Sequence, residues 1–255
     1  MKNVWIIWRK EMRTYFVSPI AYILLAMFAV IFGFFFWNSV GYFLFMGVQA
    51  QMRGEMYPMN VNEEVIRRVL ADVSVIGLFL IPLISMRLFA EEKRTGTIEL
   101  LATSPIRDGE LIFGKWLAAL SLYAGMLLLT ALDFLWLFRY GNPDWKPLAV
   151  AYLGLLLQAG ALLAVGTFIS TLTRNQIVAG AVTFGVCLLL WVLEWVSGFE
   201  SAAWARVLAY ISVLTHFESF SKGLLSTKDA VFYLSAIFLG LFLTACSMES
   251  LRWRS

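Results

Sequence analysis

The sequence predicts an all-α membrane protein with six transmembrane helices, and two observations carry that prediction. Hydrophobic residues make up 60% of the 255 residues and charged residues only 15%, against roughly 45–50% and about 25% in soluble domains. The hydrophobic residues also lie in long blocks, which indicates a bilayer as the solvent. No polar stretch between the blocks has room for an attached catalytic domain, which takes about 50 residues. We expect one membrane domain, residues 1–255.

Each of the six blocks holds about the 20 mostly apolar residues that a helix needs to cross ~30 Å of hydrocarbon. Pro82 interrupts the second block, and a proline there kinks a spanning helix without forbidding it. The predicted spans are residues 20–37, 73–90, 112–137, 148–171, 176–196 and 230–248.

The distribution of Lys and Arg predicts that both termini are cytoplasmic, because cytoplasmic segments carry the excess of these residues. With the N-terminus inside, the cytoplasmic segments hold Lys2, Arg9, Lys10, Arg13, Arg87, Lys93, Arg94, Arg107, Lys115, Arg174, Arg252 and Arg254. The outer segments hold Arg53, Arg67, Arg68, Arg139, Lys146, Arg206, Lys222 and Lys228. The net charge of +3 is too small to indicate nucleic-acid binding.

The segment before the first span has the pattern of an amphipathic helix. On residues 3–17, one arc carries Val4, Trp5, Trp8, Met12, Tyr15 and Phe16. The opposite side carries Lys2, Arg9, Lys10 and Arg13. Such a helix lies among lipid headgroups, although a simple basic anchor would give the same composition. Ser18 and Pro19 then predict a new helix, with Ser18 as N-cap and Pro19 in the first turn.

The loop 91–110 predicts a short helix between spans two and three. Charged residues 91–94 end the spanning helix in water, and Gly96 allows a sharp reversal of the chain. A new helix can start with Thr97 as N-cap and must stop before Pro105. Its Ile98, Leu100 and Leu101 would form an exposed apolar surface. That surface either docks a partner or folds back on the membrane.

Two further stretches, both on the predicted outer face, have apolar patterns of their own. Residues 61–72 have a helical apolar face and predict a short helix that leads into span two. Residues 199–226 are too apolar for a free loop and too interrupted by charge to span. This composition fits an amphipathic hairpin at the interface.

Residues 91–105 (EEKRTGTIELLATSP) carry a motif in which every fixed position of E-E-x-x-x-G-T-x-E-L-L-x-x-x-P is present. This motif resembles the hallmark of the type 2 ATP-binding cassette (ABC-2) export permeases. The resemblance implies that it forms the coupling helix, which docks into a groove of a separate ATPase subunit. The docking residues would be Gly96, Thr97, Ile98, Glu99, Leu100, Leu101 and Thr103, with Glu91, Glu92 and Arg94 as surrounding charges.

Residues 9–22 (RKE, then YFVSPIAY) and 216–223 (HFE, then KG) further resemble the gliding-motility, GldF-like branch, to which NosY-type copper-processing permeases are related. The resemblance implies an elbow helix at 1–18 with Trp5, Trp8, Arg9, Lys10 and Arg13 at the membrane interface. It also implies a re-entrant hairpin at 199–226 and a bacterial inner-membrane location.

What the family resemblance implies for function is ATP-driven export of an unidentified substrate. The implied partners are the lipid bilayer, two ATPase copies that bind the ATP and Mg²⁺, and a second permease chain, identical or homologous. This chain itself would bind no cofactor. The alternatives are a membrane scaffold for a gliding-type surface machine and a NosY-like copper-processing permease.

Other motifs do not support an enzyme. Residues 109–116 match most of a phosphate-binding loop, but Trp116 replaces the hydroxyl residue that would hold Mg²⁺. His216 is the only histidine, which excludes a site that needs two, and we interpret it as a polar residue of an outer loop. Cys187 and Cys246 lie inside apolar runs, so we predict no metal site and no disulfide framework. An intramembrane enzyme would need paired catalytic groups that these spans lack.

Two polar residues inside spans are open to two interpretations. Asp133 in the third span either faces a substrate pathway or reaches the interface, since Arg139 and Tyr140 follow it. Gln158 in the fourth span either joins two helices by a hydrogen bond or lines a pathway.

Overall fold

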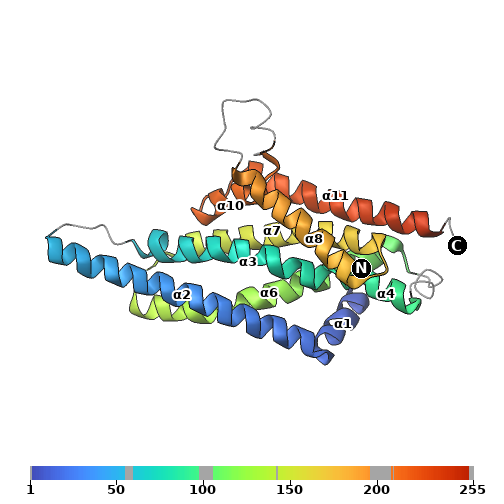
Figure 1. The fold of residues 1–255 in the computed structure, drawn as a ribbon, viewed down its shortest axis with the longest axis horizontal. Coiled ribbons are helices and arrows are strands. Elements are labelled where there is room, and N and C mark those ends of the chain that lie inside the picture. The colour runs from blue at the N-terminus through green and yellow to red at the C-terminus, as the bar shows by residue number, and fades with distance from the viewer. Residues whose placement is uncertain are drawn as a thin grey trace.

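The computed structural model describes residues 2–54, 60–97, 106–141, 143–195, 208 and 210–252. Its elements are helices, and six of them are long and apolar enough to cross a membrane. The fold class predicted from the sequence is therefore confirmed. The long helices are α2 (Pro19–Arg53), α3 (Arg68–Ser85), α6 (Asp108–Tyr140), α7 (Trp145–Leu172), α8 (Gln176–Val192) and α11 (Thr227–Arg252) (Figure 1). The shorter ones are α1 (Lys2–Val17), the π-helix η1 (Asn62–Arg67), α4 (Ala90–Thr95) and α10 (Val213–Ser221).

Helix α7 is the centre of the bundle and packs against α3, α6, α8, α10 and α11. Glycines let its neighbours approach closely, as small residues do in membrane helix pairs. A Cβ atom on Gly154 would lie 2.5 Å from Cβ of Phe220 in α10. One on Gly166 would lie 2.2 Å from Oγ of Ser85 in α3. The apolar residues of α7, which predicted a membrane span, therefore also pack against neighbouring helices on several sides.

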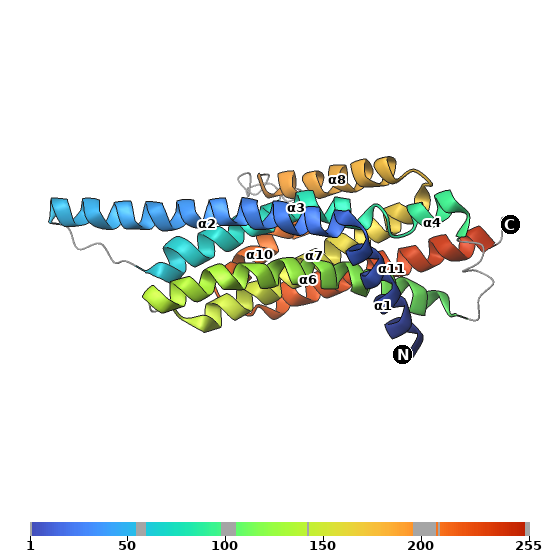
Figure 2. The same ribbon diagram turned by 90° about the horizontal axis from the view of Figure 1, so that it is seen from below.

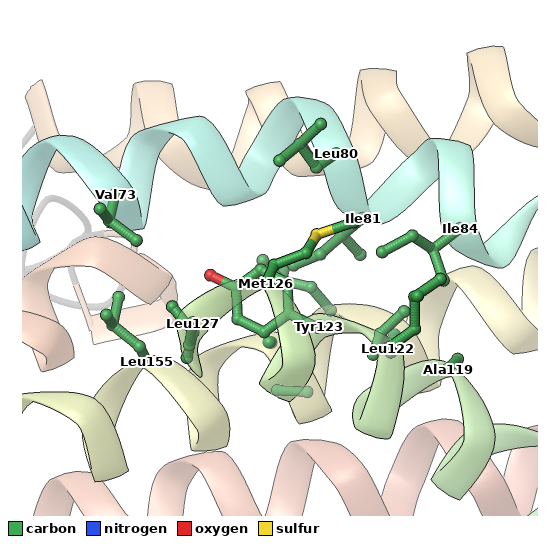
Figure 3. Packing of buried hydrophobic residues seen from close by; sticks show 14 of the residues in the cluster. Val73, Leu80, Ile81, Ile84, Ala119, Leu122, Tyr123, Met126, Leu127 and Leu155 are labelled. Atoms are coloured by element: carbon green, nitrogen blue, oxygen red, sulfur yellow. The ribbon is translucent and has the colours of Figure 1, made fainter. Parts of the chain in front are cut away.

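The core between α3, α6 and α7 consists of large apolar side chains that interdigitate (Figure 3). Ile81 and Ile84 of α3 and Met126 of α6 are at most 1% exposed. Tyr123 of α6 is also fully buried, and a Cβ atom on Gly77 of α3 would lie 3.1 Å from its Oη. Large side chains from α3, α6 and α7 therefore fill the space between these helices.

The first crossing helix is much longer than its predicted span of 20–37. Ser18 caps it as predicted, since its Oγ accepts a hydrogen bond from the Ile20 N–H at 3.4 Å, and Pro19 is the first helical residue. The helix continues to Arg53, where Gly54 ends it with a left-handed φ of 68°. Its 35 residues give a length of about 52 Å, and Figure 2 shows its last turns extending beyond the neighbouring helices. Asn38 and Ser39 ended the apolar block but do not end the helix.

The second crossing is not one continuous helix over 73–90 as predicted. Helix α3 contains Pro82 and ends at Ser85, residues 86–89 form a turn, and α4 begins at Ala90. The break falls one turn after the proline, which was expected only to kink the helix. A residue outside this segment stabilises the break, as described below.

The predicted helix at 61–72 is confirmed, because η1 continues directly into α3. Its Val65 and Ile66 are buried against the bundle. The guanidinium of Arg68 lies 4.7 Å from the ring centroid of Tyr42 in α2. Polar groups therefore gather at this level of the bundle, which is the end opposite α4 (Figure 1).

Only part of the predicted hairpin at 199–226 lies within the described residues, namely 208 and 210–226. Its helix α10 packs on α3, α7, α8 and α11, and the side chains of Phe217 and Phe220 are buried there. The interpretation of His216 as an outer-loop residue is wrong, because its side chain is buried. Its Nδ1 lies 2.7 Å from Asp229 Oδ1 and its Nε2 lies 2.8 Å from the Tyr210 carbonyl oxygen.

Candidate functional site

The candidate site lies at the end of the bundle where α4 and the C-terminus are found (Figures 1 and 2). Helices α1 and α4 and the first turns of α6 and the last turns of α7 meet there. Residues 98–105, the centre of the ABC-2-like motif, lie outside the described residues. The described residues on both sides of that motif show what it is attached to.

A buried lysine joins three helices at this end. The Nζ atom of Lys115, in the second turn of α6, lies 2.9 Å from Glu11 Oε1 of α1 and 2.8 Å from Glu92 Oε1 of α4. The side chain of Lys115 is 2% exposed, and those of the two glutamates are 12% and 13% exposed. We call Lys115, Glu11 and Glu92 the lysine hub.

The energetics of the lysine hub make its members interdependent. Burying a charged group costs several kcal/mol unless partners compensate for the lost water. The two carboxylates supply that compensation, and the ring of Phe89, whose centroid lies 5.3 Å from Nζ, covers the ammonium group. Tyr15 of α1 is buried beside the hub, and burial raises the pKa of its phenol, so it stays neutral. Moving α4 away from α6 would therefore expose or unpair a charge.

Helix α1 is fixed to α6 along its length and does not lie on lipid alone. A Cβ atom on Gly114 would lie 2.9 Å from Cγ2 of Ile7, so the two helices touch at that glycine. The Trp8 indole N–H donates to Ser121 Oγ at 2.9 Å, and the Asn3 side chain donates to Glu110 Oε2 at 2.9 Å. The docked face explains why Tyr15, predicted in the lipid-facing arc, is buried.

The remaining side of α1 keeps the features expected of an interfacial helix. Trp5 is exposed and stacks on Trp8 with ring centroids 4.3 Å apart. Arg9, Lys10 and Arg13 are exposed as well. Their contact with lipid headgroups stays a prediction.

The same geometry explains the motif that resembles a phosphate-binding loop. Its Gly114 permits the close contact with α1, and its Lys115 forms the hub. Trp116 turns inward and donates its indole N–H to the Gly160 carbonyl of α7 at 3.0 Å. Each of these residues has a packing role inside the bundle.

A serine of α7 closes the break in the second crossing. Ser170 Oγ accepts hydrogen bonds from the backbone N–H groups of Phe89 and Ala90, both at 3.0 Å, and donates to the Met86 carbonyl at 3.2 Å. One buried hydroxyl thus satisfies backbone groups that the interrupted helix leaves without partners. One turn further along α4, Lys93 Nζ donates to the carbonyl of Thr171. Helix α4 is therefore attached to the central helix as well as to the hub.

Replacing Ser170 with alanine is expected to destabilise the turn at 86–89. The substitution leaves two buried N–H groups unpaired, and each costs about 1–3 kcal/mol. Thermal unfolding in detergent should show a lower melting temperature for Ser170→Ala. Ser235→Ala serves as the control, because Ser235 is exposed and donates only to a carbonyl of its own helix. Equal melting temperatures of the two variants would contradict this role of Ser170.

The described residues of the predicted docking set surround the end of α4. Gly96 has φ 74°, which confirms the sharp reversal. Thr97 is already helical, so its prediction as an N-cap is wrong by one residue, and its Oγ1 lies 3.0 Å from Thr95 Oγ1. Arg94 is exposed, and Glu91 accepts a hydrogen bond from Arg87 Nε at 3.0 Å. Ile98, Glu99, Leu100, Leu101 and Thr103 lie outside the described residues.

Glu92 differs most from its prediction. It was expected among charges that end the helix in water, but its carboxylate points inward to Lys115. The role of Glu92 is apparent only from its contact with Lys115, which lies outside the motif. Glu92 is consequently part of the internal connection and does not belong to an exposed rim.

The two polar residues inside spans have separate surroundings. Gln158 is buried, its Oε1 accepts from Ser74 Oγ at 2.8 Å, and its Nε2 donates to the Ser74 carbonyl at 3.3 Å. These bonds join α7 to α3. Of the two roles predicted for Gln158, the hydrogen bond between helices is the one that the structure shows. Asp133 is partly exposed on α6. The structure does not bring Asp133 and Gln158 together with the site at α4.

Comparison with known proteins identifies the family. The model of the "ABC-2 family transporter protein" family matches residues 5–247, which is nearly the whole chain. This chain belongs to the ABC-2 family of transporter proteins. An ABC-2 permease is a membrane protein, in agreement with the six long apolar helices.

Relatives of this ABC-2 chain include the probable multidrug ABC transporter permease YbhR of Escherichia coli strain K12 and of strain O157:H7. Both are 26% identical to it over 169 residues, which cover 65% of this chain. The matched part covers 44% of each relative, so this chain spans less than half of their length.

Sequence reasoning missed three residues of the ABC-2 chain's candidate site, namely Glu11, Lys115 and Ser170. A weak signal existed for Lys115, since it is a cation between the apolar pairs Ile112–Phe113 and Trp116–Leu117. A lysine in such a setting needs an acidic partner. Nothing in the sequence indicates which of the several glutamates that partner is.

Proposed function

We propose that this chain is the permease subunit of an ATP-driven ABC transporter and that the site at α4 receives the force of a separate ATPase subunit. The observation that carries the proposal is the set of buried polar contacts that join α4 to α1, α6 and α7 next to residues 98–105. These contacts support the proposal because a displacement of α4 would reach α1, α6 and α7 through them.

The mechanism is a shift between two packings of the bundle. When ATP binding closes the ATPase pair, the docked segment around residues 97–103 is displaced, and α4 moves with it because the chain is continuous. Lys115 passes that displacement to α1 and α6, and Ser170 passes it to α7. Because α7 packs against α3, α6, α8, α10 and α11, its movement changes how the spans pack around the substrate route. The proposed mechanism includes no covalent step on this chain.

The direction we propose is export, which the resemblance of residues 91–105 to the ABC-2 export permeases implies. The substrate class we propose is drug compounds, because the E. coli relatives are described as probable multidrug permeases. Residues 9–22 and 216–223 favour the gliding-motility branch within the family, and a NosY-like copper-processing permease is the related alternative. We also propose the inner membrane, cytoplasmic termini, two ATPase copies and two permease chains.

The test is purification of the tagged chain from its own membranes, followed by identification of bound proteins by mass spectrometry. We expect an ATPase subunit to co-purify and its ATP hydrolysis to rise in lipid vesicles when amphipathic drugs are added. Absence of any ATPase would refute the permease assignment. An ATPase that no candidate compound stimulates would favour a scaffold role.

A further inference from the structure

A buried histidine connects α10 to the first turn of α11. The Nδ1 atom of His216 lies 2.7 Å from Asp229 Oδ1, and its Nε2 atom lies 2.8 Å from the carbonyl oxygen of Tyr210. The side chains of His216 and Asp229 are 4% and 9% exposed. We call His216, Asp229 and the Tyr210 carbonyl the histidine clamp. The clamp shares no helix with the lysine hub, so it is a separate polar cluster.

The surroundings of the His216 ring match a ring that carries two protons. Each ring nitrogen faces an oxygen that accepts hydrogen bonds, a carboxylate on one side and a backbone carbonyl on the other. A neutral imidazole has one N–H group and would present a lone pair to one of these oxygens. Only the imidazolium form donates to both. The geometry therefore fits a positively charged histidine.

The partner of that ring is suited to remain ionised. Asp229 lies in the first turn of α11, where the helix dipole favours a negative charge. A carboxylic acid is also a stronger acid than an imidazolium, so a proton shared by the two belongs on His216. The ring of Phe232 stacks on that of His216 with centroids 3.8 Å apart, and an aromatic face favours a cation. The pair is therefore a buried ion pair.

Other ionisable groups around α10 do not compete for the ring. Helices α3, α7 and α8 also pack on α10. Within the described residues, none of their ionisable side chains forms a hydrogen bond, ion pair or ring contact with His216; these are Arg68 and Asp72 of α3, Lys146 and Tyr152 of α7, Cys187 of α8 and Glu194 just after α8. Nearer the clamp, Glu218 pairs with Arg67 and Lys222, and Lys228 lies over the Tyr210 ring. Asp229 is thus the charge that decides the protonation of His216.

The histidine clamp fixes the start of α10. The N-cap residue Ser212 makes no side-chain cap hydrogen bond. Two other contacts hold this segment: His216 reaches back to the Tyr210 carbonyl, and Tyr233 of α11 donates its O–H to the Val213 carbonyl at 2.7 Å. Only the first of these two attachments depends on the protons of a histidine.

We propose that the histidine clamp is a proton-dependent lock between α10 and α11, closed while His216 carries two protons and opened when a rise in pH removes one. Loss of the proton leaves one of the two oxygens without its donor in a buried site. The stability that the clamp contributes is therefore present at low pH and is lost as the pH rises through this deprotonation. Because Phe220 of α10 packs against Gly154 of α7, the lock acts on a helix that contacts the central one. The inference goes beyond the proposed function and does not depend on it.

The first test observes the protons on the ring directly. His216 is the only histidine, so the full chain labelled with ¹⁵N-histidine and purified through a tag without histidine gives ring signals from one residue. Nitrogen chemical shifts distinguish a protonated ring nitrogen from an unprotonated one. We expect both nitrogens to be protonated in the lower part of a pH series and one to lose its proton toward higher pH. An unprotonated nitrogen at every pH at which the protein is folded would overturn the proposal.

Two variants assign the proton affinity to its cause. Asp229→Asn keeps a side-chain oxygen but removes the charge, so the proton affinity of the His216 ring should fall by roughly tenfold or more. Tyr233→Phe is the matched control, because it removes the other attachment and leaves the clamp intact, and it should not change that affinity. An unchanged affinity in Asp229→Asn, or an equal fall in both variants, would contradict the ion pair.

The last measurement connects the proton to the attachment. Hydrogen exchange of peptides that cover residues 210–216 is followed in lipid nanodiscs and corrected for the intrinsic pH dependence of exchange. We expect corrected exchange to rise by roughly tenfold or more over the pH step that removes the proton. In His216→Gln, which has no titrating ring, it should not depend on pH. Proton loss without faster exchange in the wild-type protein would refute the lock, and both wild-type measurements decide the question even where a variant does not fold.

Discussion

Replacing Lys115 with methionine is expected to produce the largest loss of stability of any single substitution at the candidate site. The variant leaves Glu11 and Glu92 buried without their shared cation. Removing one partner of a buried ion pair costs about 3–5 kcal/mol. Thermal unfolding in lipid nanodiscs should show a much lower melting temperature, and α1 should become accessible to protease because one of its attachments to α6 is lost.

A charge-neutral combination separates the lost ion pair from lost packing. Lys115→Met together with Glu11→Gln and Glu92→Gln leaves no uncompensated charge, and such replacements are often neutral. We expect this triple variant to recover most of the melting temperature. Because its α4 contact is no longer electrostatic, the triple variant should still transmit less of the ATPase's work to transport. If the single and triple variants were equally unstable, Lys115 would act by its volume and not by its charge.

Replacing Ile98, Leu100 and Leu101 together with aspartate is expected to separate ATP hydrolysis from transport. If these side chains dock into the ATPase, each loses about 1.5–3 kcal/mol of burial. At 1.4 kcal/mol for each factor of ten, the affinity for the ATPase should fall by well over tenfold, while the spans still insert. Co-purification and transport in vesicles are the measurements.

The matched control carries the same kind of change at the opposite end. Leu224 and Leu225 are exposed, at 62% and 64%, in the turn before α11. Leu224→Asp with Leu225→Asp should leave the bound amount of ATPase unchanged. Wild-type co-purification of the Ile98, Leu100 and Leu101 variant would show that residues 97–103 are not the docking segment.

The six crossings could be predicted from the sequence because a bilayer requires apolar blocks of a set length, and composition alone reveals them. The start of α2 was also predictable, since Ser18 and Pro19 act locally on the next turn. The end of α2 was not, because Asn38 and Ser39, which interrupt the apolar block, do not end the helix, and it continues to Arg53. The apolar character of a residue indicates whether lipid or water surrounds it. It does not determine where the backbone hydrogen bonds of a helix end.

The candidate site was predictable only where its residues act locally. Gly96 showed its reversal because a positive φ favours glycine. Glu92 was placed in water because its neighbours in sequence are charged, and its true partner, Lys115, is 23 positions away. Ser170 serves backbone groups about 80 residues earlier, and a serine in an apolar helix has no local mark of such a role. The roles of Glu92 and Ser170 depend on contacts between segments far apart in the sequence. Such contacts cannot be read from a single sequence.

The separation of Glu11 from Lys115 along the chain has a consequence for biogenesis. The two residues lie 104 positions apart, and synthesis at roughly 5–20 residues per second takes some seconds to cover that distance. During this interval the first helix emerges and waits without its cation, and its exposed arginines and tryptophan can hold it at the headgroups meanwhile. Docking of α1 is then a late step, because its partner Lys115 becomes available only after α6, the third crossing helix, has been inserted.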